Sequence, residues 1–437
     1  MSHIHDYVGV GFGPSNLALA IATQEFAQGV RSPDVCFLER KPAFAWHEGM
    51  LIDGSTMQIS FLKDLATLRN PQSRFTFINY LMEQGRLEDF INIQTFFPTR
   101  EEYNDYLSWA ASKFEDQVHY GQSVQSVEPL IEGGKLTGME VLSRDKNGEI
   151  QRRRARNLVL GMGGEPQVPQ AFEGINDPRI LHSSQYRGRI ETLLADSGRR
   201  ARVAVVGGGQ SAAEIFEDIT NRFPHVDASM ILRGTALKPS DDSPFVNEIF
   251  NPSFIDQIFQ QPEARRHELL TEFRNTNYAV VDLELIERIY QMFYLQKLRR
   301  EERHQMLPRR EVARVETGEG GLHLTLRDLA DDSHSEQGFD AVVLATGYRR
   351  DQHHELLAGL GDHLESFTPD RNYRLRLRNS ESRIYLQGCC EVSHGLSDTL
   401  LSVLAVRSQE ILESIFLGRS VEPQVRTERE TRLTSAL

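Results

Sequence analysis

The sequence predicts an α/β protein, because two short apolar segments, residues 7–10 and 201–206, each run into a glycine-rich turn that a helical pattern follows. A third observation is the length of 437 residues, which exceeds what one typical hydrophobic core organises. We therefore expect two Rossmann-like dinucleotide-binding domains, one opened by each segment, and a small helical insert in the second half of the chain.

Composition and charge narrow the class of protein. Hydrophobic residues make up 39% of the chain and charged residues 25%, as in ordinary globular proteins. The net charge of −13 repels nucleic-acid phosphates and anionic lipids, so neither is an expected partner. No apolar run is long enough to cross a bilayer, and the polar segment 1–6 leaves no room for a signal peptide. Cys36, Cys389 and Cys390 form no disulfide framework, which favours the reducing cytoplasm.

The sequence contains no motif for metal binding, for a redox cysteine pair or for a particular oligomeric state. The fourteen histidines show neither an H-E-x-x-H motif nor a Cys/His spacing, so no metal site is expected. No Cys-x-x-Cys pair is present, which argues against the disulfide reductases that share a two-dinucleotide plan. The sequence does not determine the oligomeric state, and a homo-oligomer is one alternative.

The first glycine-rich loop follows the strand expected at residues 7–10 and leads into a helix. Gly11 permits the tight turn, and Gly13 lets the backbone approach a pyrophosphate at the helix N-terminus, which attracts anions. Asn16 stands where the usual fingerprint has its third glycine. Glu39 ends the next strand, where a carboxylate accepts hydrogen bonds from ribose hydroxyls. These features predict a site for FAD.

The second loop, residues 207–212, fits the pattern G-x-G-x-x-A after a strand. The next strand, residues 228–232, ends in Arg233 and not in an acidic residue. An acid would select NAD by binding the ribose 2′-hydroxyl, whereas arginine suits the 2′-phosphate of NADP. Lys238 and Ser240 can add to that phosphate site, and an ordinary surface charge is the alternative for Arg233. Two such loops suggest one resident cofactor, FAD, and one shuttling reductant, NADPH.

Other local patterns predict the elements around the two loops. Thr99 followed by Glu102 is typical of a capping box at the start of a helix. The remaining expected elements are a helix at 16–27, strands at 34–38, 156–161 and 340–345, a crossover at 163–190, a helical insert whose stripe Ile286, Ile289, Tyr290, Phe293 and Tyr294 we interpret as core packing, and a last helix at 397–416 capped by Ser397 or Asp398, with a polar tail after Val421.

Eight segments spread over nearly the whole chain carry recognisable motifs. They are DYVGVGFGPSN at 6–16, MQISFLKD at 57–64, LRNP at 68–71, GGQSAAE at 208–214, DDSPFVNE at 241–248, NTNY at 275–278, ATGY at 345–348 and HGLSDTLLS at 394–402. In this order they resemble the N-hydroxylating flavin monooxygenases, the L-ornithine and L-lysine N-monooxygenases of hydroxamate siderophore synthesis. The resemblance is strongest to bacterial L-ornithine 5-monooxygenases, and Asn16 in place of glycine is itself a family trait.

The resemblance implies a reaction and a domain plan. In the family, NADPH reduces FAD by hydride transfer, and the reduced flavin adds oxygen to give a C4a-hydroperoxide. The terminal amine of the substrate takes the distal oxygen, so that L-ornithine gives N5-hydroxy-L-ornithine. The implied domains are a split FAD-binding domain at 1–165 and 341–437, a crossover linker at 166–200, an NADPH-binding domain at 201–235 and 301–340, and a helical substrate-binding insert at 236–300.

The resemblance also implies roles for individual residues. FAD would be held by Gly11, Gly13, Asn16, Glu39, Trp46, His47, Gln58, Val124 and the amides of Thr399, Leu400 and Leu401 at the start of the last helix. NADP would be held by Gly208, Gly209, Gln210, Ser211, Arg233, Asn277, Tyr278 and Ala279. The substrate would contact Lys63, Asn247, Asn277 and Ser402, with Gln58, Lys63 and Asn277 closest to the chemistry, and no metal takes part.

Elementary chemistry agrees with these roles and leaves alternatives open. The attacking amine must be neutral, and neutral asparagines do not hold an ammonium as a carboxylate would. Lys63 supplies a cation for a substrate carboxylate, although a solvated lysine is the alternative, and Asn247 and Asn277 can serve as turn or cap residues. His182 is either part of a crossover motif or a structural histidine. Lysine or a diamine such as putrescine or cadaverine is an alternative substrate, an NADPH:acceptor reductase is an alternative activity, and a flavoprotein scaffold is an alternative without catalysis.

Overall fold

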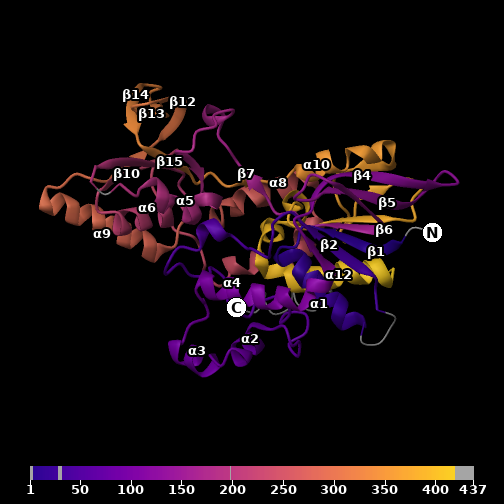
Figure 1. The fold of residues 1–437 in the computed structure, drawn as a ribbon. Coiled ribbons are helices and arrows are strands. Elements are labelled where there is room, and N and C mark those ends of the chain that lie inside the picture. Colours follow the sequence, from indigo (N-terminus) through magenta and orange to yellow (C-terminus); the bar gives the residue numbers. More distant parts are fainter. Residues whose placement is uncertain (1–2, 28–31, 197, 419–437) are drawn as a thin grey trace.

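The computed structural model describes residues 3–27, 32–196 and 198–418, which form two lobes that lie side by side, each around its own sheet (Figure 1). The seven-stranded sheet of the first lobe has the order β3-β2-β1-β6-β5-β4, with β19 paired to β6. Its strands β1, β2, β3, β6 and β19 run parallel, and β4 and β5 add an antiparallel ribbon. The strands are β1 Ile4–Val10, β2 Val35–Glu39, β3 Val118–Tyr120, β4 Ser123–Glu132, β5 Lys135–Arg144, β6 Ile150–Leu160 and β19 Arg383–Leu386.

The second lobe contains a five-stranded parallel sheet of order β11-β10-β9-β15-β8. A separate three-stranded antiparallel sheet projects from this lobe at the top of Figure 1. The strands are β8 Ile180–His182, β9 Ala201–Val206, β10 Val226–Leu232, β11 Gln305–Pro308, β15 Ala341–Leu344 and, in the projecting sheet, β12 Arg310–Gly318, β13 Gly321–Asp328 and β14 His334–Phe339.

Helices cover both sheets. The α-helices are α1 Pro14–Phe26, α2 Phe77–Glu83, α3 Leu87–Ile93, α4 Arg100–Ala111, α5 Tyr186–Leu193, α6 Gln210–Arg222, α7 Phe254–Phe259, α8 Glu263–Phe273, α9 Leu283–Arg299, α10 Gln352–Leu356, α11 Glu391–His394 and α12 Leu404–Phe416. The 3-10 turns are η2 Glu48–Met50, η3 Ser112–Gln117, η4 Gln170–Phe172, η5 Ser183–Gln185, η6 Val246–Phe250, η7 Arg274–Thr276, η8 Ala358–His363, η9 Leu396–Thr399 and η10 Leu401–Val403. Short strand pairs are β7 Glu165–Pro166 with β16 Tyr348–Arg349, and β17 Leu364–Ser366 with β18 Arg376–Leu377.

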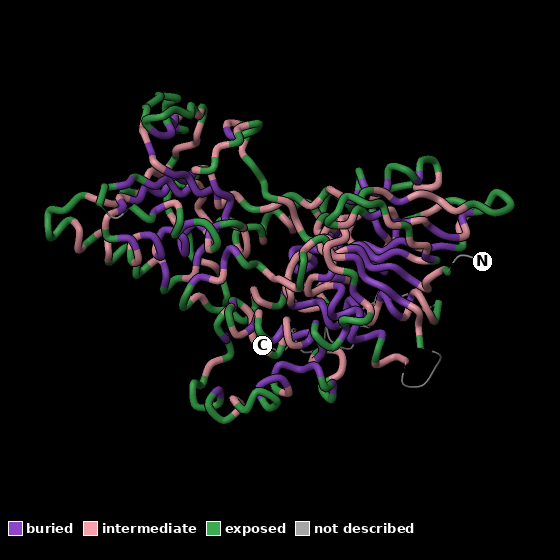
Figure 2. The backbone as a smooth tube through the Cα atoms, in the orientation of Figure 1, coloured by how far each residue is buried: buried purple, intermediate pink, exposed green. Residues whose placement is uncertain are grey.

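Each lobe has its own buried core, as the separate groups of buried strands in Figure 2 show. In the first lobe α1 and α12 pack together, because α1 buries the continuous apolar run from Leu17 to Ala22. In the second lobe α6 and α9 pack together, and Leu285 and Ile289 of α9 belong to that core. Among the described residues no helix is both long and apolar enough to cross a membrane.

The two expected strand–helix–strand units are confirmed as β1-α1-β2 and β9-α6-β10. The predicted cap of the next helix is also confirmed, because the Thr99 hydroxyl accepts a hydrogen bond of 3.1 Å from the Glu102 N–H at the start of α4. These features could be predicted because each depends on a few neighbouring residues.

Two strands lie in a sheet that differs from the expectation. The strand at 341–344 was expected to return the chain to the first sheet, but β15 pairs with β9 in the second sheet. The return strand is β19, which pairs with β6. The expected linker at 166–200 also contains β8, which extends the second sheet beside β15. An apolar run shows that a strand is buried, but not which partner it has.

The last helix begins later than expected. Residues 396–403 form the 3-10 turns η9 and η10, and α12 starts at Leu404, so neither Ser397 nor Asp398 is its N-cap. Asp398 is fully buried, accepts a hydrogen bond from the Cys390 N–H and forms an ion pair of 2.8 Å with Arg407. Asp398 therefore binds side-chain and backbone groups elsewhere in the fold and does not cap this helix. The tail predicted after Val421 lies outside the described residues.

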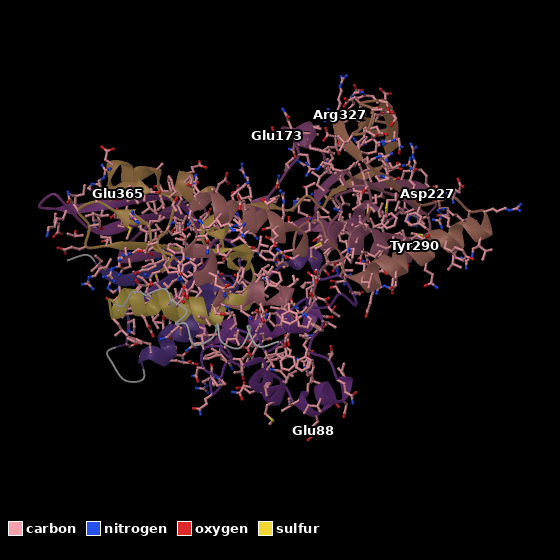
Figure 3. The ribbon with its side chains drawn as sticks, turned by 180° about the vertical axis from the view of Figure 1, so that it is seen from behind. Glu88, Glu173, Asp227, Tyr290, Arg327 and Glu365 are labelled. Atoms are coloured by element: carbon pink, nitrogen blue, oxygen red, sulfur yellow. The ribbon has the colours of Figure 1, made fainter. Side chains whose placement is uncertain are left out.

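The stripe on α9 is only partly core. Ile289 is 3% exposed, as expected, but Tyr290 and Tyr294 are 75% and 61% exposed, so the core interpretation is wrong for the two tyrosines. Tyr290 lies on the outer flank of the second lobe (Figure 3).

Candidate functional site

The first glycine loop has the shape that a dinucleotide site needs. Gly11 has φ +81°, and a Cβ atom on it would lie 2.5 Å from the Gly161 carbonyl oxygen, so only glycine fits. Its N–H donates to the Leu38 carbonyl over 2.8 Å, which holds the loop across the ends of the strands. A Cβ atom on Gly13, the residue before α1, would meet no protein atom within 4 Å. The loop therefore leaves open space at the helix N-terminus, which fits a pyrophosphate.

Glu39 has a structural role that the sequence did not reveal. One carboxylate oxygen accepts the Phe12 N–H of the loop over 2.7 Å, and the other accepts the Lys41 N–H over 2.9 Å. Each oxygen keeps a second lone pair. The residue fits the predicted contact with a ribose, and it also fixes the loop.

The side chain of Asn16 bonds to other protein groups, and its contact with FAD stays a prediction. The side chain is fully buried, and its Nδ2 donates to the carbonyls of Gly11 over 2.7 Å and of Val10 over 3.2 Å. Its Oδ1 accepts a hydrogen bond of 2.9 Å from Gln387. Asn16 thus supports the loop from beneath, which explains why it can replace the glycine.

The other residues expected at FAD lie on several elements of the first lobe. Trp46 packs against the core beside His47, which has φ +47° in the left-handed region, and Val124 lies at the irregular start of β4. Residues 399–401 lie where η9 meets η10. These amides were expected in the first turn of the last helix. They belong instead to two short 3-10 turns, because α12 starts only at Leu404.

The second glycine loop repeats the geometry of the first. A Cβ atom on Gly207 would lie 2.4 Å from the Ala345 carbonyl oxygen, and the Gly207 N–H donates to Ile231 over 2.9 Å. Gly209 precedes α6, as Gly13 precedes α1. Arg233 directly follows β10, is exposed, and has no ion pair among the described residues. A cation at this strand end, free to bind a ligand, fits a 2′-phosphate.

The turn at residues 277–279 lies against this loop. A Cβ atom on Gly209 would be 3.6 Å from the Ala279 Cα, and Ala279 itself has φ +58°. The Tyr278 hydroxyl donates to Glu391 of the first lobe, and burial raises the pKa of Tyr278 to about 12, so the hydroxyl keeps its proton. The side chain of Asn277 is half-buried, and no partner of it is found within the described chain. Lys238 and Ser240 flank the same turn, because their backbones bond to Val281.

Lys63 lies in a turn that its neighbour fixes. Asp64 is buried and accepts hydrogen bonds from the N–H groups of Ala66, Thr67 and Phe77 over 2.9, 2.6 and 2.8 Å. Sequence reasoning missed Asp64, although an aspartate that accepts from the residues two and three places later is a recognisable turn signal. Lys63 itself is half-buried, burial lowers its pKa, and it forms no ion pair with a described residue. A partly desolvated cation without an internal partner fits an anionic ligand.

Two further expected substrate contacts have unused oxygen atoms. Asn247 donates its Nδ2 to the Asp242 carbonyl over 2.7 Å, which confirms a turn role, but its Oδ1 accepts no hydrogen bond from a described residue. Ser402 is buried, and its Oγ lacks a partner within the described part of the chain. The turn η6, which carries Asn247, contacts η9.

Histidines contribute structure and one surface cluster. The His182 ring accepts from the Ser184 N–H and bonds to the Gly347 carbonyl over 3.1 Å, so the structural alternative holds for this residue. His3, His5 and Asp34 lie together at the start of the inner strands β1 and β2 in a group that could hold a metal ion, which no linear motif indicated.

Gln58, expected beside the flavin, donates its Nε2 to Asp282 over 2.9 Å. Asp282 also accepts from Gln210 of the second loop over 2.8 Å. Asp282 could not be identified from the sequence, because nothing in its neighbourhood points to residues so distant in the chain.

Comparison with known proteins agrees with this geometry. Residues 3–350 match the family model described as L-lysine 6-monooxygenase/L-ornithine 5-monooxygenase. The chain belongs to this family. It is 52% identical over 400 residues, 90% of each chain, to the L-ornithine N(5)-monooxygenase of Burkholderia cepacia. The ornithine hydroxylase structure from Pseudomonas aeruginosa matches with a TM-score of 0.91 and 47% identity, covering 95% of this chain and 99% of that one.

A third family member is the ornithine N-hydroxylase of Kutzneria sp. 744, described with reduced FAD, NADP⁺ and L-ornithine. It matches with a TM-score of 0.89 and 36% identity, over 96% of this chain and all of that one. The similarity therefore extends over both lobes, and the expected family and fold class are confirmed.

Proposed function

We propose that this protein is an FAD- and NADPH-dependent N-monooxygenase that converts L-ornithine to N5-hydroxy-L-ornithine for hydroxamate siderophores. Family membership supplies the reaction class. The observation that carries the amino-acid substrate is Lys63, a half-buried cation that forms no ion pair with a described residue. Such a cation is stabilised when it binds a carboxylate, which ornithine has and a diamine lacks.

The two loops fit the two nucleotides. FAD would lie at Gly11 and Gly13 with its ribose at Glu39, and NADPH would lie at residues 208–211 with its 2′-phosphate at Arg233. Bound FAD supplies the redox chemistry, taking a hydride from NADPH and activating oxygen for transfer to nitrogen. The protein supplies binding, orientation and the exclusion of water.

The substrate residues divide the work between the two ends of ornithine. Lys63 would hold the carboxylate, and it would repel a protonated amine, which favours the neutral nucleophile. Asn247 and Asn277 would accept hydrogen bonds from the amines without supplying a negative charge. Ser402, on the turn η10, would offer its hydroxyl to the substrate as a further hydrogen-bonding group. Gln58 would lie beside the flavin, where its amide is oriented by Asp282.

Steady-state and product analysis tests the proposal. The holoenzyme with NADPH is offered ornithine, lysine, putrescine and cadaverine, and hydroxylamine product is scored against peroxide release. Hydroxylated ornithine in strong preference supports the proposal. Equal use of lysine or a diamine contradicts the substrate, and NADPH consumption that yields peroxide with every amine favours the acceptor reductase instead.

We further infer that the enzyme works in the cytoplasm on small molecules alone. The three unpaired cysteines suit a reducing compartment, and the net charge of −13 disfavours nucleic acid. That the protein forms a homo-oligomer stays a prediction, and analytical ultracentrifugation of the holoenzyme, which measures its mass in solution, tests it.

A further inference from the structure

Five polar side chains form a chain of hydrogen bonds across the boundary between the lobes, beside the second glycine loop, and backbone hydrogen bonds of the first lobe close this chain into a ring. We call this ring the interlobe clasp. Its members are Gln58 and Arg100 of the first lobe and Gln210, Glu214 and Asp282 of the second.

Asp282 forms one side of the clasp. Its Oδ1 accepts from Gln58 over 2.9 Å, and its Oδ2 accepts from Gln210 over 2.8 Å. The Asp282 N–H in turn donates to the Gln210 Oε1 over 2.8 Å. Because a carboxylate only accepts hydrogen bonds, both glutamines must turn their NH₂ groups toward it. Asp282 therefore fixes the orientation of one amide in each lobe.

Glu214 and Arg100 form the other side. Two parallel N–H···O bonds of 2.7 Å join the guanidinium to the carboxylate, and the two side chains are only 11% and 8% exposed. Gln210 also donates to Glu214 over 2.8 Å, so the two sides share this glutamine. Bidentate pairs of this kind fix geometry as well as energy.

The first lobe closes the ring through its backbone. The Met57 N–H donates to the Pro98 carbonyl over 2.8 Å, and the Arg100 N–H donates to the Ser55 carbonyl over 2.9 Å. Gln58 and Arg100 therefore stand on two segments that are bonded to each other. Gln58 and Arg100 therefore hold the residues beside the second glycine loop at two points of the first lobe, and the backbone bonds between their segments keep these two points together.

We propose that the clasp sets the position of the second glycine loop, so that the nicotinamide of NADPH meets the flavin of the first lobe. Arg100, Glu214 and Asp282 are then positioning residues, acting through Gln210 and Gln58. The proposal rests on the proposed function in one respect, that the second loop binds NADPH. Met50 and Ile52 of the first lobe also pack in the second core. Apolar contacts do not fix an orientation, however, whereas the hydrogen bonds of the clasp do.

Matched pairs of variants test the clasp in the holoenzyme. Glu214→Gln is compared with Glu217→Gln, since both glutamates lie on α6 and both bind an arginine through two bonds, but Glu217 binds Arg288 within the second lobe. Asp282→Asn keeps the size of the side chain and leaves one acceptor where two donors arrive. Its control is Asp227→Asn, on the outer flank of the second lobe and paired with Arg303 (Figure 3).

Two measurements are made on each variant. Anaerobic reduction of the bound flavin by NADPH is followed in a stopped-flow instrument. Hydrogen–deuterium exchange is measured for the amides of residues 55–58 and 99–101. Glu214→Gln and Asp282→Asn should slow reduction about ten-fold or more, because small displacements of reacting atoms are costly. Exchange should rise in both segments, while the FAD content and absorption spectrum stay unchanged. The controls should stay within about two-fold of the wild type.

The outcomes separate the two claims. If both clasp variants match their controls in reduction and exchange, the clasp proposal is overturned. If NADPH does not reduce the flavin of the wild-type protein at all, the proposed function fails. Hydrogen–deuterium exchange then decides by itself whether the clasp holds the two lobes together. A loss of FAD by Glu214→Gln would leave the decision to the isosteric Asp282→Asn.

Discussion

The Gln387 amide donates a hydrogen bond to the Asn16 Oδ1 over 2.9 Å, and this bond ties the loop after β19 to the first turn of α1. The other two bonds of Asn16 hold the carbonyls of the first glycine loop. Asn16→Gly restores the usual fingerprint but leaves these groups unpaired, so it should cost about 1–3 kcal/mol and lower FAD occupancy. Chemical unfolding and the flavin-to-protein absorbance ratio measure the two effects.

Asn157→Ala is the matched control for Asn16. Asn157 also donates from its side chain to a carbonyl of β1, that of Asp6, but in the half of the strand remote from the glycine loop. Its loss should cost about 1 kcal/mol while FAD stays bound. Equal loss of FAD by both variants would refute the special role of Asn16.

Arg233→Glu should weaken NADPH and spare FAD. The exposed guanidinium is proposed to bind the 2′-phosphate, and a hydrogen bond to a charged group contributes about 1.5–3 kcal/mol, so the KM for NADPH should rise about ten-fold or more. The KM for NADH should change little, because NADH has no 2′-phosphate. Arg299→Glu, exposed at the end of α9, is the control for net charge. Equal effects on the two nucleotides would mean that Arg233 does not select between them.

The pH dependence of substrate capture should report on Lys63. Burial lowers its pKa, so the lysine loses its charge at a lower pH than an exposed lysine. Capture of a carboxylate is therefore complete below this pKa and falls as the pH rises through it, while the ornithine amine gains its neutral form over the same rise. The profile of kcat/KM for ornithine should show a fall on the alkaline side.

Lys63→Arg keeps the charge at every accessible pH, so the alkaline fall should move to higher pH or vanish. Lys113→Arg, at an exposed site on η3, should leave the profile unchanged. An alkaline fall that is identical in wild type and Lys63→Arg would assign it to another group.

Asp398→Asn should be among the most destabilising conservative changes. It leaves the fully buried guanidinium of Arg407 without its counter-charge, and breaking such a pair costs about 3–5 kcal/mol. Glu381→Gln, whose pair with Lys135 is exposed, should cost less than about 1 kcal/mol. Urea unfolding of both variants decides the matter. A small effect of Asp398→Asn would show that the pair contributes little to the fold.

Local signals predicted local structure in this chain. The two glycine loops, the strands before them and the Thr99 cap depend on residues a few positions apart, and all of them form as expected. Arg233 was likewise placed correctly at the end of a strand.

Long-range partners could not be predicted in the same way. The hydrogen bond from Gln387 to Asn16 could not be predicted, because the two residues are 371 positions apart. The buried run at 341–344 looked like a return to the first sheet, because apolar strands of either sheet have the same pattern. Asp282 has the same difficulty, since its hydrogen bonds reach 224 and 72 residues back along the chain.

The pairing of β6 with β19 sets an order of events during synthesis. These neighbouring strands are separated in the chain by the whole second lobe, and the short β7–β16 pair marks where the chain leaves and returns. The second lobe has all its strands once β15 has been made, whereas the first lobe still lacks β19, the partner of β6. We expect the second lobe to fold first on the ribosome, and the first lobe to complete its sheet only after β19 has been made. A nascent chain truncated before β19 therefore exposes the edge of β6 that β19 would cover.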